Sequence, residues 1–269
     1  MKPLLFIITF ILTLHVHGQQ RQEISEIDLI IAPLQRYLDG HIKGDSQLLG
    51  SALHTQGKLS YISKGEHRQL IFSDYLNGMK LRNTDDVIKR IPYVKSIDLT
   101  GDVAIGKLVL DYSSRLFTDY MTLLKINGEW KITNKIAYSV ADPKNSKALQ
   151  VDMPLLLRAI KRFAQAYQSA DSKKLMAEFD ADAKVMSNIN GQYRTKTISN
   201  FVADLSAASA KSGRLAKYTI QNVDATGNVA IGKIVFHYPE TTQTQYLSLL
   251  KVAGEWKIVN SAINAEAKH

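Results

Sequence analysis

The feature that most constrains the fold is an internal repeat. The motif Gly-Glu-Trp-Lys-Ile occurs at residues 128–132 and again at residues 254–258, an offset of 126 positions. Aligning residues 27–143 with residues 153–269 at this offset, without a gap, gives identical residues at about a quarter of the positions. A repeat of this length is too long for a solenoid unit and predicts two duplicated domains.

The N-terminus has the pattern of a secretory signal. Lys2 precedes an apolar run over residues 4–14, and a polar stretch follows up to Gln19. A run of about 11 residues is too short to span a bilayer about 30 Å thick, which requires about 20 residues. We therefore expect residues 1–19 to be a signal peptide cleaved near Gly18-Gln19, and the mature protein to be periplasmic or secreted. No later segment predicts a transmembrane helix.

Composition narrows the classes of site that the chain can contain. Cysteine is absent, which excludes disulfides, thiolate nucleophiles and sulfur-ligated metals. The histidines of the mature chain lack the close spacing typical of a metal site, so we expect no metal and no cofactor. The formal net charge of +9 is compatible with nucleic-acid binding, but the lysines occur singly and no segment combines a basic stripe with aromatic residues. We expect a solvated basic surface and no nucleic-acid partner, with weak attraction to anionic envelope surfaces as the alternative.

Within each copy, helical patterns precede strand patterns. Apolar residues recur at spacings of three and four over residues 27–41 and 156–167, which predicts an amphipathic helix at the start of each copy. Residues 103–112 and 229–238 are rich in β-branched residues, and Asn127-Gly128 between apolar runs predicts a β-hairpin. Helices followed by an antiparallel meander predict an α+β fold.

These patterns predict two domains joined by a short linker. We assign residues 20–137 to the first domain, residues 138–152 to a polar linker and residues 153–269 to the second domain. Both faces of the strands at 103–112 and 229–238 are largely apolar, which is typical of a sheet covered by helices on one face and by another sheet on the other. The two domains should therefore pack as a pseudo-dimer within one chain.

A string of motifs in the first copy resembles a known bacterial family. The motifs are Tyr37-x-x-Gly40, Gly44-Asp45, Gly101-Asp102-Val103-Ala104, Asp119-Tyr120 and Leu123-Leu124-Lys125-Ile126-x-Gly128-x-Trp130-Lys131-Ile132. They resemble the putative lumazine-binding family, a branch of the nuclear transport factor two-like superfamily. The resemblance implies two tandem cone-shaped domains, each with three helices packed on a curved, mainly antiparallel sheet and a pocket between them. Members of the superfamily often dimerise through the outer sheet face.

His54 and Asp119 are the candidate catalytic residues. Some relatives on this fold, such as scytalone dehydratase and ketosteroid isomerase, abstract a proton next to a carbonyl with a His or Asp in the pocket. A His–Asp pair would supply a general base with a pKa near neutral. The alternative is that His54 ends a helix and Asp119 caps a strand, and that neither has a catalytic role.

The candidate ligand-binding residues are Tyr37, His41, His54, Asp119 and Trp130. His41 lies on the apolar stripe of the first helix, where a polar tip is either a ligand contact or a hydrogen-bonded core residue. Trp130 alternates with Ile132, as the core positions of a half-buried strand do. Lys131 and Lys135 should lie on the opposite face of that strand, exposed to solvent.

The second copy differs from the first at most of these positions. The residues in the places of His41, His54, Asp119 and Lys135 are Tyr167, Asp180, Gln245 and Ser261. We therefore expect any small-molecule pocket in the first copy, while the second copy completes the interface. The sequence favours a non-catalytic exported module that binds a small organic ligand or presents a protein-binding surface. The alternative is a lyase or isomerase that acts through His54 and Asp119.

Overall fold

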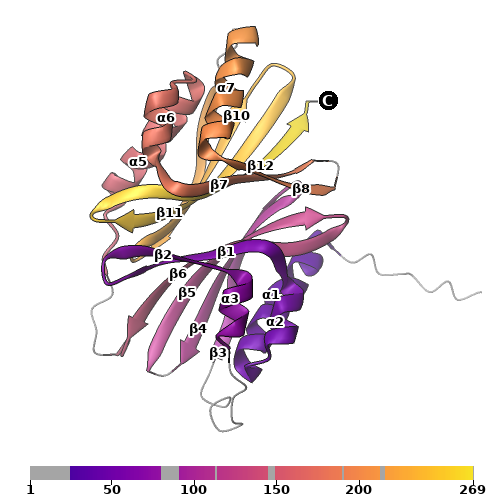
Figure 1. Ribbon diagram of the computed structural model, residues 1–269, viewed down its shortest axis with the longest axis vertical. Coiled ribbons are helices and arrows are strands. Elements are labelled where there is room, and N and C mark those ends of the chain that lie inside the picture. The colour runs from indigo at the N-terminus through magenta and orange to yellow at the C-terminus, as the bar shows by residue number, and fades with distance from the viewer. Residues whose placement is uncertain are drawn as a thin grey trace, which may run out of the picture.

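The computed structural model describes residues 25–79, 91–112, 114–144, 149–189, 191–212 and 216–268. The predicted signal peptide and its cleavage site lie outside these residues. Figure 1 shows two halves of similar architecture, each built from helices packed on a curved sheet. They are the two tandem α+β domains that the repeat predicts.

The first half contributes one six-stranded sheet and the helices that cover it. The helices are α1 (Glu26–Lys43), α2 (Ser46–Ala52) and α3 (Phe72–Asn77). The strands are β1 (Leu53–Ser63), β2 (Glu66–Ile71), β3 (Ile91–Thr100), β4 (Val103–Tyr112), β5 (Arg115–Ile126) and β6 (Glu129–Ala141). Their order in the sheet is β2-β1-β6-β5-β4-β3. Only the β1–β6 pair is parallel in this described sheet, so the sheet is mainly antiparallel as predicted.

The second half repeats this arrangement. Its helices are α5 (Met153–Gln168), α6 (Ser172–Glu178) and α7 (Ile198–Ser212). Its strands are β7 (Phe179–Ile189), β8 (Gln192–Thr197), β9 (Lys217–Thr226), β10 (Val229–His237), β11 (Thr241–Val252) and β12 (Glu255–Ala267). Their order, β8-β7-β12-β11-β10-β9, matches that of the first sheet strand for strand. Strand β6 continues to Ala141 and therefore includes the first residues of the segment predicted as a linker.

Local sequence signals set the ends of helix α1. The Ser25 side chain accepts a hydrogen bond from the backbone N–H of Asp28, and the Asp28 carboxylate accepts one from the backbone N–H of Ser25. Gly44 ends the helix in the left-handed conformation at φ 66°. Between these caps, Ile30 and Tyr37 belong to the buried stripe that packs on the sheet, which confirms the predicted amphipathic helix.

The β5–β6 hairpin forms at the predicted turn. Asn127 and Gly128 both have positive φ, at 50° and 83°. This pair of left-handed residues matches the twist of the two flanking strands. In the second half Ala253 and Gly254 take the same conformation, at 48° and 88°.

A β-bulge in strand β6 changes the pattern of inward and outward side chains. Ile132 pairs with Leu123 of β5, whereas Asn134 pairs with the preceding residue, Thr122. Thr133 is therefore an extra residue of β6 that has no partner on β5. Because side chains alternate along a strand, one extra residue reverses which positions point inward beyond it.

The bulge turns Lys135 into the interior of the first domain. Thr133 contacts Met186 and Asn134 contacts Ser248, so both adjacent side chains face the second half of the chain. Lys135 is therefore directed to the other face of the sheet, under the helices, where it is buried. The prediction that Lys135 lies exposed to solvent is wrong, because it assumed an uninterrupted alternation along β6.

The two sheets pack against each other with their helices on the outside (Figure 1). Each domain has its own core between helices and sheet. A third apolar cluster joins the halves and draws on both sheets; its buried members are Val103, Ile105, Tyr120, Leu124, Ile136, Met186, Val229, Ile231, Tyr246, Leu250, Val259 and Ala262. The predicted pseudo-dimer is thus formed by the sheet faces that the helices leave open.

Crossed ion pairs show that the interface has pseudo-two-fold symmetry. The Nζ atom of Lys107 lies 2.8 Å from a carboxylate oxygen of Asp224. The Nζ atom of Lys233 lies 2.7 Å from a carboxylate oxygen of Asp98. Since Lys107 corresponds to Lys233 in the repeat, and Asp98 to Asp224, the second bridge is the first with the halves exchanged. This is the reciprocity of an isologous dimer interface.

Two equivalent tyrosines make a second set of reciprocal contacts between the halves. The hydroxyl of Tyr120 lies 3.2 Å from that of Thr226, and the hydroxyl of Tyr246 lies 2.9 Å from that of Thr100. These polar contacts flank the apolar cluster and fix the register of the sheets. The pairing therefore selects one orientation of the two domains.

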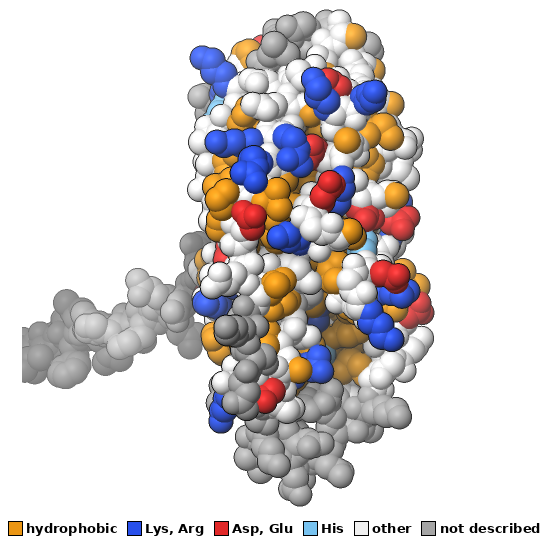
Figure 2. Space-filling view, turned by 90° about the vertical axis from the view of Figure 1, so that its left-hand side faces the viewer, with side chains coloured by type: hydrophobic (Ala, Val, Ile, Leu, Met, Phe, Trp, Pro, Cys, Tyr) orange, Lys and Arg blue, Asp and Glu red, His pale blue; other side chains and the backbone are white. Residues whose placement is uncertain are grey.

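The part of the chain that the structure describes contains no helix long and apolar enough to cross a membrane. On the face shown in Figure 2, basic and acidic side chains are interspersed with apolar ones.

Deleting residues 143–269 should expose the apolar sheet face of the first domain. We expect the remaining half to dimerise or aggregate, because burial of that face contributes roughly 25 cal/mol per Å² of apolar area. Sedimentation velocity on the truncated and full-length chains checks this. A half that stays folded and monomeric at micromolar concentration would contradict the interface described above.

Candidate ligand-binding site in the first domain

A cavity of about 410 Å³ lies inside the first domain, between its helices and the concave face of its sheet. Its walls are mainly apolar and aromatic, including Leu59, Tyr61, Leu110 and Phe117. Small-molecule sites are typically concave, of about 300–1,000 Å³, with a few polar groups among apolar walls. The cavity has the size and the lining of such a site.

A buried ion pair forms the polar part of the lining. The Nζ atom of Lys135 lies 2.8 Å from Oδ2 of Asp119, and the two side chains are only 6% and 1% exposed. Asp119 comes from β5 and Lys135 from β6, on the inward side that the bulge creates. A buried charge requires a partner. Each of these two side chains provides the partner of the other.

A chain of hydrogen bonds extends from the ion pair along the helical wall. The hydroxyl of Tyr37 donates to Oδ2 of Asp119 over 3.2 Å and accepts from Lys135. The hydroxyl of Tyr75 lies 3.2 Å from that of Tyr37 and contacts Nε2 of His41. The lysine ammonium also lies 5.2 Å and 5.3 Å from the ring centres of Tyr37 and Tyr75. Five side chains from two helices and two strands therefore form one network.

Burial and charge keep this network in a defined protonation state. Burial is the main cause that raises the pKa of Tyr37 well above its usual value, so its hydroxyl stays neutral. For Lys135, burial acts to lower the pKa, but the negative charge of Asp119 and the hydrogen bond to it outweigh burial, and the pKa is raised. Lys135 is therefore an ammonium ion. It can donate hydrogen bonds but cannot act as an amine nucleophile.

Asp119, which lines the cavity, also has a free acceptor atom. Its Oδ1 atom is buried and has no hydrogen-bond partner among the described residues. Buried polar atoms in folded proteins are nearly always hydrogen-bonded, and an exception inside a cavity indicates a group that a ligand or an ordered water would supply. The group that satisfies Oδ1 must be a hydrogen-bond donor.

The second domain contributes one residue to the cavity. Asn228 lies in the β9–β10 turn, and its Oδ1 atom is buried without a hydrogen-bond partner in the described part of the chain. The neighbouring Gly227 has φ 61°, and a Cβ atom there would lie 2.4 Å from ring atoms of Tyr138, which also lines the cavity. Only glycine allows the turn to approach this ring so closely. The turn therefore places a second free acceptor in the lining.

The structure separates the residues that the sequence proposed as one site. His41 and Asp119 line the cavity, and Tyr37 supports Asp119 from behind. His54 lies at the boundary between the halves, where its ring is 4.3 Å from that of Tyr193. His54 and Asp119 therefore do not form the proposed pair.

The placement of His54 follows from strand alternation. His54 is the second residue of β1, and its neighbour Leu53 belongs to the core of the first domain. The side chain of His54 must then point to the opposite face of the sheet. The equivalent position in the second half, Asp180, likewise contacts the other half, through His67 at 3.1 Å.

Trp130 lies in the core beneath helix α1, and the cavity lining does not include it. Its indole N–H donates to Glu26 over 3.0 Å. Sequence reasoning missed Lys135 and Tyr75 as parts of the site. The substitution of Lys135 by Ser261 between the copies was the available signal, because the ion pair depends on a charge that only the first copy has.

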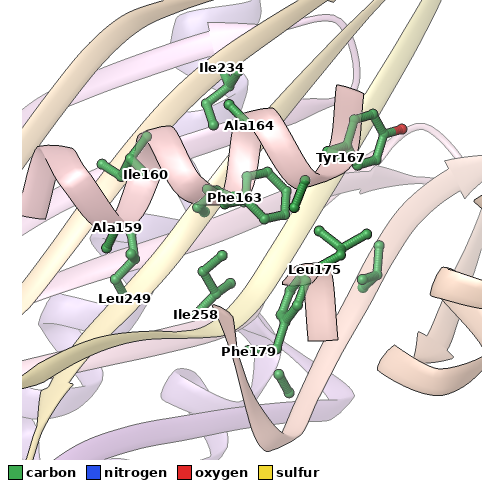
Figure 3. Packing of buried hydrophobic residues seen from close by; sticks show 14 of the residues in the cluster. Ala159, Ile160, Phe163, Ala164, Tyr167, Leu175, Phe179, Ile234, Leu249 and Ile258 are labelled. Carbon is green, nitrogen blue, oxygen red and sulfur yellow. The ribbon is translucent and has the colours of Figure 1, made fainter. Parts of the chain in front are cut away.

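The equivalent region of the second domain is packed with aromatic side chains. Tyr167, which replaces His41, has its ring 4.2 Å from that of Phe236 and 6.0 Å from that of Phe201. Figure 3 shows Tyr167 and Phe163 in this core. Gln245 and Ser261 replace the ion pair with a neutral hydrogen bond of 3.4 Å. The two domains thus share a fold but differ in the chemistry of their interiors.

Comparison with known families agrees with this architecture. A model of the family described as "Putative lumazine-binding" matches residues 25–138 and again residues 152–263. The chain belongs to this family. The two matches correspond to the two halves of the structure. Among the described residues, no group of three or more His, Asp or Glu side chains is placed to bind a metal ion.

Individual relatives of this family member are distant. Aldolase FrzH from Cladobotryum sp. is 25% identical over 105 residues, which cover 38% of this chain and 82% of that protein. An NTF2-like protein of unknown function from Shewanella baltica OS155 is 18% identical, with 44% of this chain and 95% of that chain covered and a TM-score of 0.40. A ketosteroid isomerase-like protein from Erwinia carotovora atroseptica is 14% identical, with 45% and 99% covered and a TM-score of 0.37.

Replacing Lys135 by Met should leave Asp119 as an unpaired buried charge. We expect this variant to lose about 3–5 kcal/mol of unfolding free energy, measured by urea denaturation. Lys131→Met, which removes a partly exposed ion pair with Glu129 in the same strand, should cost less than about 1 kcal/mol. Replacing Asp119 by Leu together with Lys135→Met should recover part of the loss. If Lys135→Met matched Lys131→Met, the ion pair would not have the role assigned to it.

Proposed function

We propose that the first domain binds one small, planar organic ligand whose edge carries an N–H group next to a carbonyl. The observation that supports this most strongly is the free Oδ1 atom of Asp119, buried in the cavity wall beside the ammonium of Lys135. The carboxylate can accept the N–H group while the ammonium donates to the carbonyl oxygen. A lactam or imide edge offers both groups side by side.

The remainder of the lining suits a flat and mainly apolar molecule. Tyr61, Tyr112 and Phe117 provide aromatic surface, and Leu59 and Leu110 provide aliphatic surface. Aromatic side chains prefer offset-stacked or edge-to-face contacts with other rings. The few polar groups then fix the orientation of the ligand, as they do in most small-molecule sites.

Lumazine is a suitable first probe. It is a flat bicyclic heteroaromatic with imide edges, and the family to which the chain belongs is described as "Putative lumazine-binding". Its fluorescence also allows binding to be followed directly. The proposal itself concerns the class of ligand, which is any planar heteroaromatic with the stated edge.

We also propose that the protein is exported. The signal-like pattern of residues 1–19 supports this. The absence of cysteine is compatible with an oxidising compartment, since no thiol is exposed there to oxidation.

Binding is better supported than catalysis. A lyase or isomerase would use Asp119 as its general base, but Oδ2 of this carboxylate already binds the ammonium of Lys135 and the hydroxyl of Tyr37. His54, the other proposed catalytic residue, contacts Tyr193 at the domain boundary instead.

Replacing Asp119 by Asn should weaken lumazine binding at least about tenfold, because a charge-assisted hydrogen bond is lost. Gln245→Asn, at the equivalent position of the second domain, should leave the affinity unchanged. His54→Ala should also leave it unchanged. Fluorescence titration of the three variants measures this, with circular dichroism to establish that each is folded. Equal losses from Asp119→Asn and Gln245→Asn would contradict a site confined to the first domain.

Asn228 should contribute to affinity from the second domain. Its free Oδ1 atom can accept a donor at the end of the ligand nearest the β9–β10 turn. We expect Asn228→Ala to weaken the binding of a lumazine with a hydroxylated side chain by about five- to tenfold, because one hydrogen bond is lost. The affinity for lumazine itself, which lacks that side chain, should fall less. Asn200→Ala, at an exposed position of helix α7, serves as the control. Identical effects on both ligands would show that Asn228 does not contact the ligand.

A further inference from the structure

A second, smaller cavity lies between the two sheets. Its volume is about 150 Å³, and residues of both halves line it. Ten of the twelve lining residues form five equivalent pairs of the repeat, and two of these pairs are identical: Lys58 with Lys184, and Asn134 with Asn260. The cavity therefore lies where the pseudo-two-fold symmetry brings the same positions of the two copies together.

The repeat retains these four residues in strand segments that have otherwise diverged. Lysine at 58 and 184 is the only residue that β1 and β7 share at equivalent positions. Beyond the bulge, asparagine at 134 and 260 is the only residue that β6 and β12 share before their last residue. Both retained pairs line the same cavity. Neither a β-strand nor an apolar interface requires lysine at such a position.

The charges of this cavity are incompletely balanced. Burial, followed by the positive charge of Lys184, lowers the pKa of Lys58, while Asp182 acts in the opposite direction. Lys58 donates to the neutral Oε1 atom of Gln69 over 2.9 Å. Two ammonium groups thus share the cavity with one carboxylate, that of Asp182. Like charges that converge in a partly buried site destabilise it unless an anion compensates them.

An unused hydrogen-bond donor lies in the same lining. The Nδ2 atom of Asn260 is buried and has no hydrogen-bond partner among the described residues. Asn260 as a whole is only 2% exposed. Its counterpart Asn134 donates to the hydroxyl of Ser248 over 3.4 Å. The amide of Asn260 would be satisfied by an acceptor inside the cavity.

We propose that this cavity binds a small oxyanion, held by Lys58 and Lys184 from the two halves and by the amide of Asn260. Ammonium and amide N–H groups are both donors, and an oxyanion of phosphate or sulfate size offers several acceptor oxygens at once. The bound anion would join the two sheets at their pseudo-symmetry axis. The site is separate from the first-domain pocket and does not depend on the function proposed for it.

Inorganic phosphate is the probe that tests this site. The full-length protein should broaden the ³¹P resonance of phosphate, and sulfate should reverse the broadening by competition. Phosphate should also raise the melting temperature by several degrees relative to chloride at equal ionic strength, because a ligand of the folded state stabilises it. If phosphate is neither broadened nor stabilising, the proposal is wrong.

Variants of the two lysines distinguish a built site from general salt effects. Lys58→Gln and Lys184→Gln should each weaken phosphate binding at least tenfold, whereas Lys173→Gln, at an exposed position of helix α6, should have no effect. In chloride alone, Lys58→Gln should melt at or above the temperature of the unmodified protein, since it removes a like-charge repulsion. Asp182→Asn should tighten phosphate binding several-fold. The same phosphate response in Lys58→Gln and Lys173→Gln would overturn the proposal, and the ³¹P competition on the unmodified protein decides it if a variant does not fold.

Discussion

The packing of the two sheets is the constraint on which the rest of the structure depends. A curved sheet with helices on one side leaves an apolar face open, and the second copy of the same sequence covers it. At the centre of the interface, the side-chain hydroxyls of the equivalent residues Thr122 and Ser248 lie 3.5 Å apart. Crossed ion pairs on either side fix the register, so both copies must keep the interface residues. This requirement explains why Lys107 and Lys233 correspond while the interiors have diverged.

The interior of the first domain is organised by one extra residue. Without the bulge at Thr133, Lys135 would point toward the second half and Asp119 would be a buried charge without a partner. With it, the pair forms under the helices, and Tyr37 and Tyr75 connect it to His41. Ser261 occupies the same inward position in the second domain, where the bulge is retained and the charge is not. The fold thus supplies the position, and a few substitutions decide whether a polar pocket exists there.

Much of the fold could be predicted from the sequence because its signals are local and occur twice. The helix stripe that includes Tyr37 and the turn at Asn127-Gly128 follow from periodicity and turn chemistry. The pocket was less predictable, because it depends on a register shift that no local pattern reveals. Uninterrupted alternation along β6 therefore predicts the wrong face for Lys135. Analogy with other proteins pairs His54 with Asp119, whereas strand alternation after Leu53 directs His54 to the interface.

The central claim is that a duplicated fold has kept one ligand site of two, inside the first domain. Native mass spectrometry of the protein purified from its natural source tests this most directly, because a ligand enclosed in a cavity should be retained in the gas phase. The account predicts one heteroaromatic molecule per chain, lost when Asp119 is replaced by Asn and retained when Gln245 is replaced. Two identical molecules per chain, or a ligand that persists in the Asp119 variant, would contradict it.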